Sequence, residues 1–272
     1  MKKIIVVVAC MVGFFASATA QVKEGKISYE QKVNMYRMIT DPEMRARVPE
    51  FRTDKFELLF NEQASLYRTV VDDEAPDPFA NNGGDRGGNR FMFRMPETAT
   101  YTDINTQMQY EARAMFEKSF LIVDSLKPQQ WKISDVTKTI AKHVCKKATT
   151  MITQPQQMRM RFGNGPRNAE DTVKPKPKEV ELTVWYTEDI PVSVGPNSYT
   201  GLPGAILEVD TDNGANIITA TEVVGKYPKK ELVQPTKGEK MNRAQFQDAM
   251  KKIMEDMQKG GGMGGMRIRV NN

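Results

Sequence analysis

The chain is poor in the side chains that most often hold metals or act as nucleophiles. Its 272 residues include one histidine, His143, and two cysteines, Cys10 and Cys145. Zinc sites combine several His and Cys ligands, so the sequence argues against zinc, and we expect no cofactor. His143 and Cys145 stand two residues apart on an expected strand, about 6–7 Å along the chain. That is too far for a Cys–His nucleophile pair, and we predict a buried cysteine beside a surface histidine.

The sequence also lacks an apolar run long enough to cross a membrane, which takes about 18 residues or more. The longest run occupies residues 4–16, after a positively charged start, and is followed by Ala18-Thr19-Ala20. This pattern predicts a secretory signal peptide over residues 1–20 that is cleaved after Ala20. A lipoprotein is the alternative, because Cys10 follows a lipobox-like sequence, although apolar residues continue beyond it.

Neither sign of charge dominates. Removal of Lys2 and Lys3 with the signal peptide leaves 37 of the 39 basic residues against 34 acidic ones. This balance does not favour nucleic-acid binding. One cysteine remains after the signal peptide, so no internal disulfide can form and the core must stabilise the fold alone. With 39% apolar residues, the chain suffices for one large domain.

Alternation of apolar and polar residues predicts strands along most of the chain. The expected strands occupy residues 25–33, 55–61, 64–71, 99–103, 108–116, 118–124, 131–133, 138–151, 179–186, 205–211 and 215–224. Asn213-Gly214 predicts a hairpin between the last two. The fold class we expect is mostly β, with a single curved or partly closed antiparallel sheet, long loops and a C-terminal amphipathic helix. That helix is expected near residues 242–259, with Asn242 as its cap and a glycine run at its end.

These patterns divide the chain into four parts. The expected division is a signal peptide over residues 1–20, a β-rich domain over 21–240, an amphipathic helix over 241–259 and a Gly/Met-rich tail over 260–272. Two stretches of the β-rich domain, 72–89 and 154–178, are rich in Gly, Pro and polar residues. We expect them to be mobile loops, because they offer little apolar surface to bury.

Residues 185–209 are the most distinctive stretch of the sequence. Pro203-Gly204 fits the central positions of a type II turn, in which glycine supplies a positive φ. Leu202 is driven towards extended geometry by the proline after it. We therefore predict a stiff crossing loop between Tyr186 and Ala205, with Trp185, Tyr199 and Leu202 capping one end of the core.

Two roles for this loop remain open. It either serves only to close the sheet, as Gly/Pro turns usually do, or it holds a partner or ligand, as rigid loops often do. The candidate binding residues are Trp185, Ile190, Pro191, Tyr199, Gly201, Leu202, Pro203 and Gly204.

The same stretch resembles a known family. Residues 201–206 read Gly-Leu-Pro-Gly-Ala-Ile and are similar to the motif of the GLPGLI family, also called the Porph_ging domain, with Ala205 in place of leucine. Upstream, residues 138–148 resemble that family's "K-x-I-x-G-Y-x-C-x-K-A" strand, with Lys142 and His143 in place of Gly and Tyr. The resemblance implies an exported, β-rich protein of Bacteroidota without an established activity or catalytic residue. It also implies a partner among TonB-dependent outer-membrane receptors, and a place in the periplasm or peripherally on the outer membrane.

Three segments alternate arginine with methionine, phenylalanine or aliphatic residues: 90–95, 158–162 and 266–270. They either pin loops to the domain, or adhere to a partner's sheet edge or to anionic lipid. A third alternative is Cu(I) binding through thioethers, although the interleaved arginines would repel a cation. The candidate copper ligands are Met158, Met160, Met263 and Met266.

No nucleophile-elbow, phosphate-binding or dinucleotide motif occurs in a strand–helix context. We therefore expect no catalytic residue and no enzyme. The expected function is that of a periplasmic, non-enzymatic binding or assembly factor associated with outer-membrane receptor proteins. The alternatives are a carrier of an apolar ligand in the concave sheet and a methionine-based Cu(I) binder.

Overall fold

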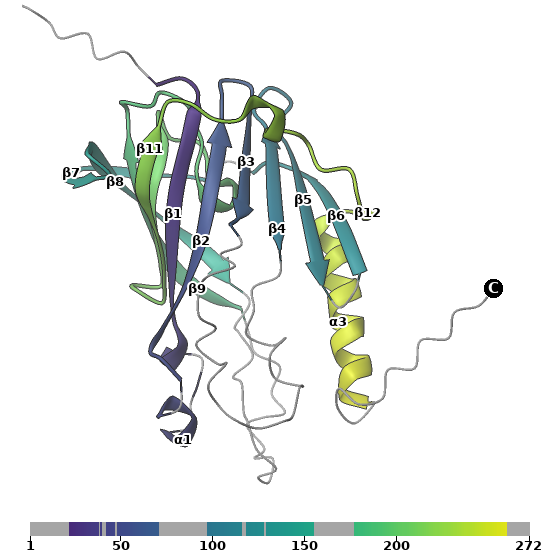
Figure 1. The fold of residues 1–272 in the computed structure, drawn as a ribbon. Helices are drawn as coiled ribbons and strands as arrows, with labels where there is room; N and C mark the ends of the chain where they lie inside the picture. The colour runs from purple at the N-terminus through teal and green to yellow at the C-terminus, as the bar shows by residue number, and fades with distance from the viewer. Residues whose placement is uncertain are drawn as a thin grey trace, which may run out of the picture.

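The computed structural model describes residues 22–37, 39, 42–46, 48–70, 97–115, 118–127, 129–154 and 177–259. They form one largely antiparallel, open sheet with a helix at its C-terminal end (Figure 1), which confirms the expected fold class. The strands are β1 (Gly25–Asn34), β2 (Phe51–Phe60), β3 (Ala64–Thr69), β4 (Thr98–Asp103), β5 (Met108–Met115), β6 (Lys118–Ser125), β7 (Lys132–Ile140), β8 (His143–Gln154), β9 (Lys178–Thr187), β10 (Ala205–Thr211), β11 (Asn216–Val224) and β12 (Glu239–Met241).

The chain enters the sheet at its middle. From β1 it runs strand by strand to β6, near one end of the sheet, and then restarts with β7 at the opposite end. From β7 it returns strand by strand to β11, which pairs antiparallel with β1. The short β12 then adds parallel to β6. Two sets of consecutive antiparallel strands are therefore joined at the β1–β11 pair.

The predicted strand positions agree with the structure except around β7 and β8. The sequence predicted one run over residues 138–151, but that run contains a two-residue turn at Ala141 and Lys142, with φ of 46° and 71°. Positive φ at both central residues is the geometry of a tight hairpin turn, for which Asn and Gly are the usual signals. Neither residue is present here, and the hairpin was therefore missed.

Two other differences are small. The one-turn helix α1 (Pro42–Arg45) lies between the first two predicted strands, where the sequence predicted no helix. The three-residue strand β12 was not predicted, because it is too short to show a pattern and two of its three residues are exposed. The expected hairpin at Asn213-Gly214 is confirmed, and Asp212, Asn213 and Gly214 all have positive φ.

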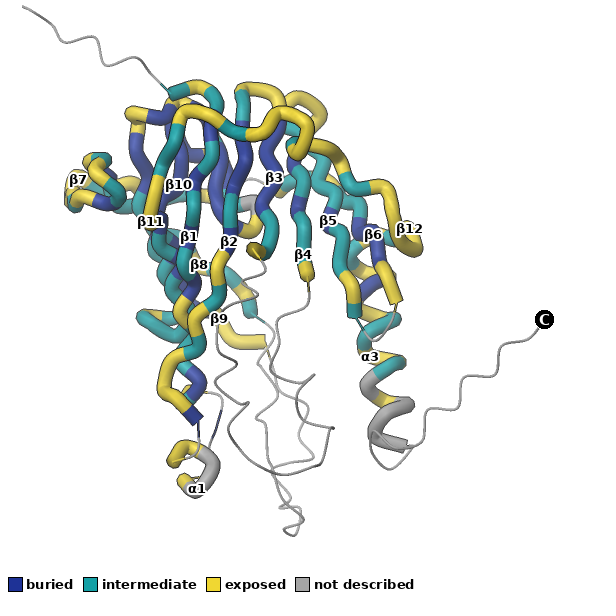
Figure 2. The backbone as a smooth tube through the Cα atoms, in the orientation of Figure 1, coloured by how far each residue is buried: buried dark blue, intermediate teal, exposed yellow. Residues whose placement is uncertain are grey.

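The main core lies on one face of the sheet, which we call the inner face. Apolar side chains of β1, β2 and β8 to β11 meet there, as the buried segments in Figure 2 show. Tyr29 of β1 is buried at the centre, and its hydroxyl donates a 2.7 Å hydrogen bond to the carbonyl of Ile206 in β10. Because β10 has a bulge between Ile206 and Glu208, this bond satisfies a carbonyl beside an interruption of the ladder.

Helix α3 (Arg243–Lys259) covers the far end of the sheet. Asn242 accepts a hydrogen bond from the Gln245 amide at 2.8 Å, and the Gln245 side chain accepts one from the Asn242 amide at 2.9 Å. This reciprocal capping confirms the predicted start of the helix. Phe246 then packs edge-on against Phe120 of β6, with ring centroids 5.4 Å apart.

A small ionic cluster reinforces this contact. The carboxylate of Glu111, almost fully buried on β5, lies 2.6 Å from Nη2 of Arg243 and 2.5 Å from Nη2 of Arg113. The guanidinium of Arg113 also lies over the Phe246 ring, 5.5 Å from its centre. A carboxylate this buried requires such partners, so the start of α3 is held to β5 as well as to β6.

Several expectations concern residues outside the described ranges. These are the signal peptide over 1–20, loop 72–89, nearly all of loop 154–178, the tail 260–272, the three Arg/Met segments and the four candidate copper ligands. Among the helices that are described, none is long and apolar enough to cross a membrane.

Candidate functional site

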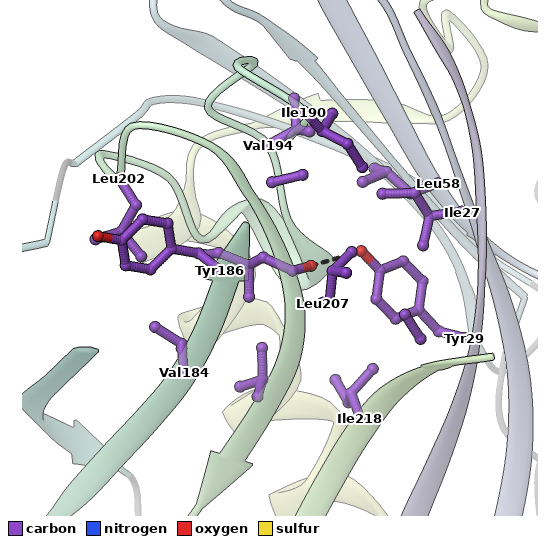
Figure 3. Close-up of a cluster of buried hydrophobic side chains, with 14 of the residues drawn as sticks. Ile27, Tyr29, Leu58, Val184, Tyr186, Ile190, Val194, Leu202, Leu207 and Ile218 are labelled. Atoms are coloured by element: carbon purple, nitrogen blue, oxygen red, sulfur yellow. Dashed lines mark hydrogen bonds between the residues drawn. The ribbon is translucent and has the colours of Figure 1, made fainter. Parts of the chain in front are cut away.

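The crossing loop follows β9 and covers residues 188–204. Ile190, Val192 and Val194 are all buried and join the main core, and Figure 3 shows Ile190 and Val194 beside Ile27 of β1 and Leu58 of β2. Alternate residues of this segment thus point inward. The loop itself fills part of the inner face of the sheet.

Backbone hydrogen bonds fasten the loop to the start of β10. The amide of Ala205 donates to the carbonyl of Ile190 at 3.0 Å, and that of Ile206 donates to Val194 at 2.9 Å. The next turn of the loop, the short helix η3 (Pro196–Ser198), lies against β3 and β4. The loop therefore reaches across the inner face to strands that are distant in the sequence.

The glycines of the motif have different roles from those predicted. The type II turn with positive φ at Gly204 is wrong, because the residue with positive φ is Gly201, at 90°. The amide of Gly201 donates to Oγ of Ser193 at 2.8 Å, which fixes that unusual conformation. Gly204 is required for space instead, since a Cβ there would lie 1.9 Å from the carbonyl oxygen of Thr187.

Leu202 and Tyr199 lie where the capping prediction put them. Leu202 is buried beside Tyr186 (Figure 3), and Tyr199 packs half-buried on the same core. Trp131, just before β7, donates from Nε1 to the carbonyl of Thr200 at 2.8 Å. This indole contact could not be predicted from the sequence, because Trp131 lies 69 residues from its partner.

Trp185 also packs partly buried against the main core, but from the other side. It neighbours Tyr186 on β9, so its side chain lies on the opposite face of the sheet. There Nζ of Lys138 lies 4.4 Å from the centre of the indole ring and 2.5 Å from Oε1 of Glu208. Lys138 belongs to β7, which curls towards β11 over this face. Trp185 therefore serves to hold β7 in place.

The remaining candidates in the loop are exposed turn positions: Pro191, Gly201 and Pro203. Between them, the apolar side chains of the loop point into the core. The geometry therefore favours the first of the two roles, in which the loop closes the sheet.

The thiol of Cys145 is fully buried, and burial raises its pKa from 9.0 to about 11. Its sulfur lies 3.6 Å from the backbone carbonyl of His143, while Nδ1 of His143 lies 3.0 Å from Oδ2 of Asp189. The imidazole is thus oriented towards a carboxylate and not towards the thiol. A buried cysteine beside a more exposed histidine agrees with the expectation. A thiol that retains its proton is a poor nucleophile.

The β7–β8 hairpin carries most of the large apolar side chains that are exposed in the described part of the chain. Four of the seven large apolar side chains exposed there belong to this hairpin: Ile133 (52% exposed), Val136 (56%), Val144 (62%) and Met151 (58%). Most of β7 is exposed as well, as Figure 2 shows at the end of the sheet. Sequence reasoning missed this surface because it did not divide β7 from β8.

The same hairpin is basic. Residues 131–154 contain five lysines and one acidic residue, Asp135. Two of the lysines are paired, Lys138 with Glu208 and Lys146 with Glu188. Lys132, Lys142 and Lys147 have no ionic partner among the described residues. The hairpin therefore combines exposed apolar side chains with unneutralised positive charge.

The remaining features of the described residues provide no stronger candidate site. An open cavity of about 350 Å³ lies at the ends of β3 to β6, beside Lys237, but none of the predicted site residues lines it. Within the described ranges, no three His, Cys, Asp or Glu side chains come together as metal ligands would.

These features define a β-sheet protein whose core is closed by a Gly/Pro-rich crossing loop. Residues 131–208, from the start of the β7–β8 hairpin to β10, match the family described as "Protein of unknown function (Porph_ging)". The resemblance that the loop indicated is thereby confirmed for this part of the chain.

No curated protein matches the chain. Two solved structures of PNGF-II, in space groups C2 and P21, are similar at 15% sequence identity and a TM-score of 0.49. The matches cover 84% and 85% of this chain but 33% of each PNGF-II chain. The protein thus spans about a third of the length of the PNGF-II chains that it matches.

Proposed function

We propose that the protein is a non-enzymatic binding or assembly factor of the cell envelope, acting in the periplasm beside outer-membrane receptor proteins. The observation that carries this proposal is the β7–β8 hairpin. It ends the sheet with a strand that is largely exposed and bears Ile133 and Val136 at its surface. Soluble proteins usually protect such edges, and apolar side chains exposed on an edge strand are available for contact with a partner.

The chemistry of the described residues supports binding over catalysis. The buried Cys145 thiol has a raised pKa, and the histidine two residues before it faces Asp189. A catalytic cysteine instead sits in an environment that lowers its pKa and exposes it. The periplasmic address rests on the signal-peptide pattern of residues 1–20.

The packing of the inner face weighs against the carrier of an apolar ligand. The part of that face formed by β1, β2, β9 and β10 is covered by Ile190, Val192, Val194 and Leu202 of the crossing loop. A ligand there would have to displace these side chains, at a cost of about 2 kcal/mol for each one returned to water. The surface hairpin is accessible without such a rearrangement.

A photo-crosslinking amino acid placed at position 133 tests the proposal in intact cells. We expect it to capture a specific outer-membrane protein. The matched control is position 239 on β12, an exposed strand residue at the opposite end of the sheet from β7. If both positions capture the same proteins, or position 133 captures none, the proposal is wrong.

A further inference from the structure

We propose that the free edge of β7 binds an extended, acidic–apolar segment of a partner protein, which adds to the sheet as a further strand. The proposal rests on the proposed function, because it specifies the partner of the same hairpin. Three features of β7 support such binding: its hydrogen-bonding pattern, the alternation of its side chains and its charge.

The register of the hairpin shows which backbone groups are available. Ile140 and His143 flank the two-residue turn and therefore exchange hydrogen bonds. Residues alternate from there, so that Lys132 and Ser134 point their backbone groups towards β8. Ile133 and Thr137 point theirs towards the free edge. No described strand pairs with this edge of β7, so a partner strand could bind these donors and acceptors.

The bulge in β7 is compatible with this docking. The register shifts between Ser134 and Thr137, and the amide of Val136 is satisfied by Oγ of Ser134 at 3.3 Å. Towards its C-terminal end β7 curls towards β11. The residues before and at the bulge, 132–137, are therefore the part of the edge that remains open for pairing.

Side-chain alternation gives the edge two different faces. Ile133 shares one face with its cross-strand partner Ala148, whereas Lys132 and the Ser134–Lys147 pair share the other. Directly opposed residues of neighbouring strands share a face. In an added strand, the residue paired with Ile133 would thus lie on the same face as Ile133 and is expected to be apolar. The residues before and after it in the added strand would lie on the face that carries the lysines. That arrangement selects a segment in which apolar and acidic residues alternate.

Charge argues against the other occupants. A second copy of the chain would bring Lys132 and Lys147 of one edge near the same lysines of the other, and like charges in paired strands are destabilising. The chain's own Arg/Met segments, residues 90–95, 158–162 and 266–270, alternate apolar residues with arginine. They would be repelled for the same reason. An acidic segment would instead meet the unpaired lysines.

A synthetic peptide of the 9-residue length of β7, alternating glutamate and valine, provides the probe. Titrated into the isotope-labelled protein, it should shift the amide resonances of Ile133 and Thr137 first. A peptide with lysine in place of glutamate should bind roughly tenfold more weakly, because it would repel the unpaired lysines instead of pairing with them. The charge reversals Lys132→Glu and Lys147→Glu together should invert this preference.

Ile133→Pro tests strand addition itself. The amide of Ile133 faces away from β8, so proline there removes no bond within the hairpin but blocks pairing at the edge. The matched control is Ile133→Thr, which keeps the amide. We expect Ile133→Pro to abolish peptide binding while Ile133→Thr retains it. Equal binding by both variants, or equal affinity for the acidic and basic peptides, would overturn the inference.

The two proposals fail in different ways. Capture of an outer-membrane protein from position 133, with no acidic preference in the peptides, would retain the function and reject the strand-addition model. Acidic peptide binding without capture in cells would reject the outer-membrane partner and retain the chemistry of the edge.

Discussion

At the scale of single residues, Gly204 has the tightest surroundings in the crossing loop. A Cβ at this position would lie 1.9 Å from the carbonyl oxygen of Thr187, at the point where β9 ends. A backbone atom cannot move aside as a flexible side chain can. We expect Gly204→Ala to lower the free energy of unfolding by about 3 kcal/mol, measured by urea denaturation. Gly225→Ala is the control, because a Cβ at Gly225 has no atom within 4 Å. Equal stability of the two variants would contradict this account.

Lys142 occupies the position at which the Porph_ging motif has glycine. Its φ of 71° lies in the left-handed region, which costs a residue with a Cβ about 1–2 kcal/mol. We expect Lys142→Gly to stabilise the protein by about 0.5–1 kcal/mol, since part of that gain is offset by the entropy of the unfolded chain. Lys147→Gly, in the middle of β8, should instead destabilise it. A thermal melt of both variants distinguishes these signs.

The buried thiol of Cys145 makes stability depend on pH in the alkaline range. Because the native thiol has a pKa of about 11 and the free thiol one of 9.0, the unfolded state loses its proton first. The stabilising contribution is therefore complete below about pH 9 and is lost as the pH rises through about 11. Between pH 8 and pH 10, we expect the free energy of unfolding of Cys145→Ala to fall by roughly 1 kcal/mol less than that of the wild type. The buried tyrosines are present in both proteins, so an unchanged difference would rule out the thiol as the cause.

At the scale of elements, the sequence predicted what depends on local patterns. The strands show clear alternation, and α3 has both a cap at Asn242 and an apolar stripe, with Phe246 packed on β6. The sequence-based prediction failed where a contact with residues distant in the sequence determines the conformation. The positive φ at Lys142 occurs without a turn-forming residue, and the space requirement at Gly204 comes from Thr187.

The candidate site shows the same limit. The motif identified the crossing loop, and Leu202 is indeed buried there. Alternation along β9 puts Trp185 on the opposite face from Tyr186, but the sequence could not show that Lys138 lies over its ring, because that contact depends on the curl of β7. Nor could it indicate the exposed edge, since exposure of Ile133 and Val136 depends on which strand ends the sheet.

The cap of α3 gives a test at this scale. Asn242 and Gln245 satisfy each other's amides, and replacement of a helix cap by alanine costs about 1 kcal/mol. We expect Asn242→Ala to increase hydrogen exchange in the first turn of α3 while the strands β1 and β2 keep their protection. Asp248→Ala, at an exposed position of the same helix, should leave exchange nearly unchanged. Uniform loss of protection throughout the sheet would contradict a local role.

At the scale of the whole molecule, Tyr29 connects the two sets of strands. Its hydroxyl donates a hydrogen bond to the Ile206 carbonyl across the core, whereas the buried hydroxyl of Tyr67 has no hydrogen-bond partner among the described residues. Loss of a partner from a buried carbonyl costs about 1–3 kcal/mol. We expect Tyr29→Phe to lower global stability by that amount in a single cooperative transition. Tyr67→Phe should be neutral or stabilising, and calorimetry of both variants checks the contrast. A larger loss for Tyr67→Phe would refute it.

The position of β1 at the centre of the sheet has a consequence for how the protein is made. A ribosome delivers β1 and β2 first, but the other neighbour of β1 is β11, whose residues 216–224 come nearly two hundred positions later. Until β11 has been synthesised, the edge of β1 that pairs with it is unpaired, and the apolar side chains of β1 are only partly buried. Contacts of such long sequence separation form slowly. Chains interrupted before residue 216 would therefore expose the centre of the sheet rather than its rim, and such fragments should aggregate instead of folding into a smaller version of the protein.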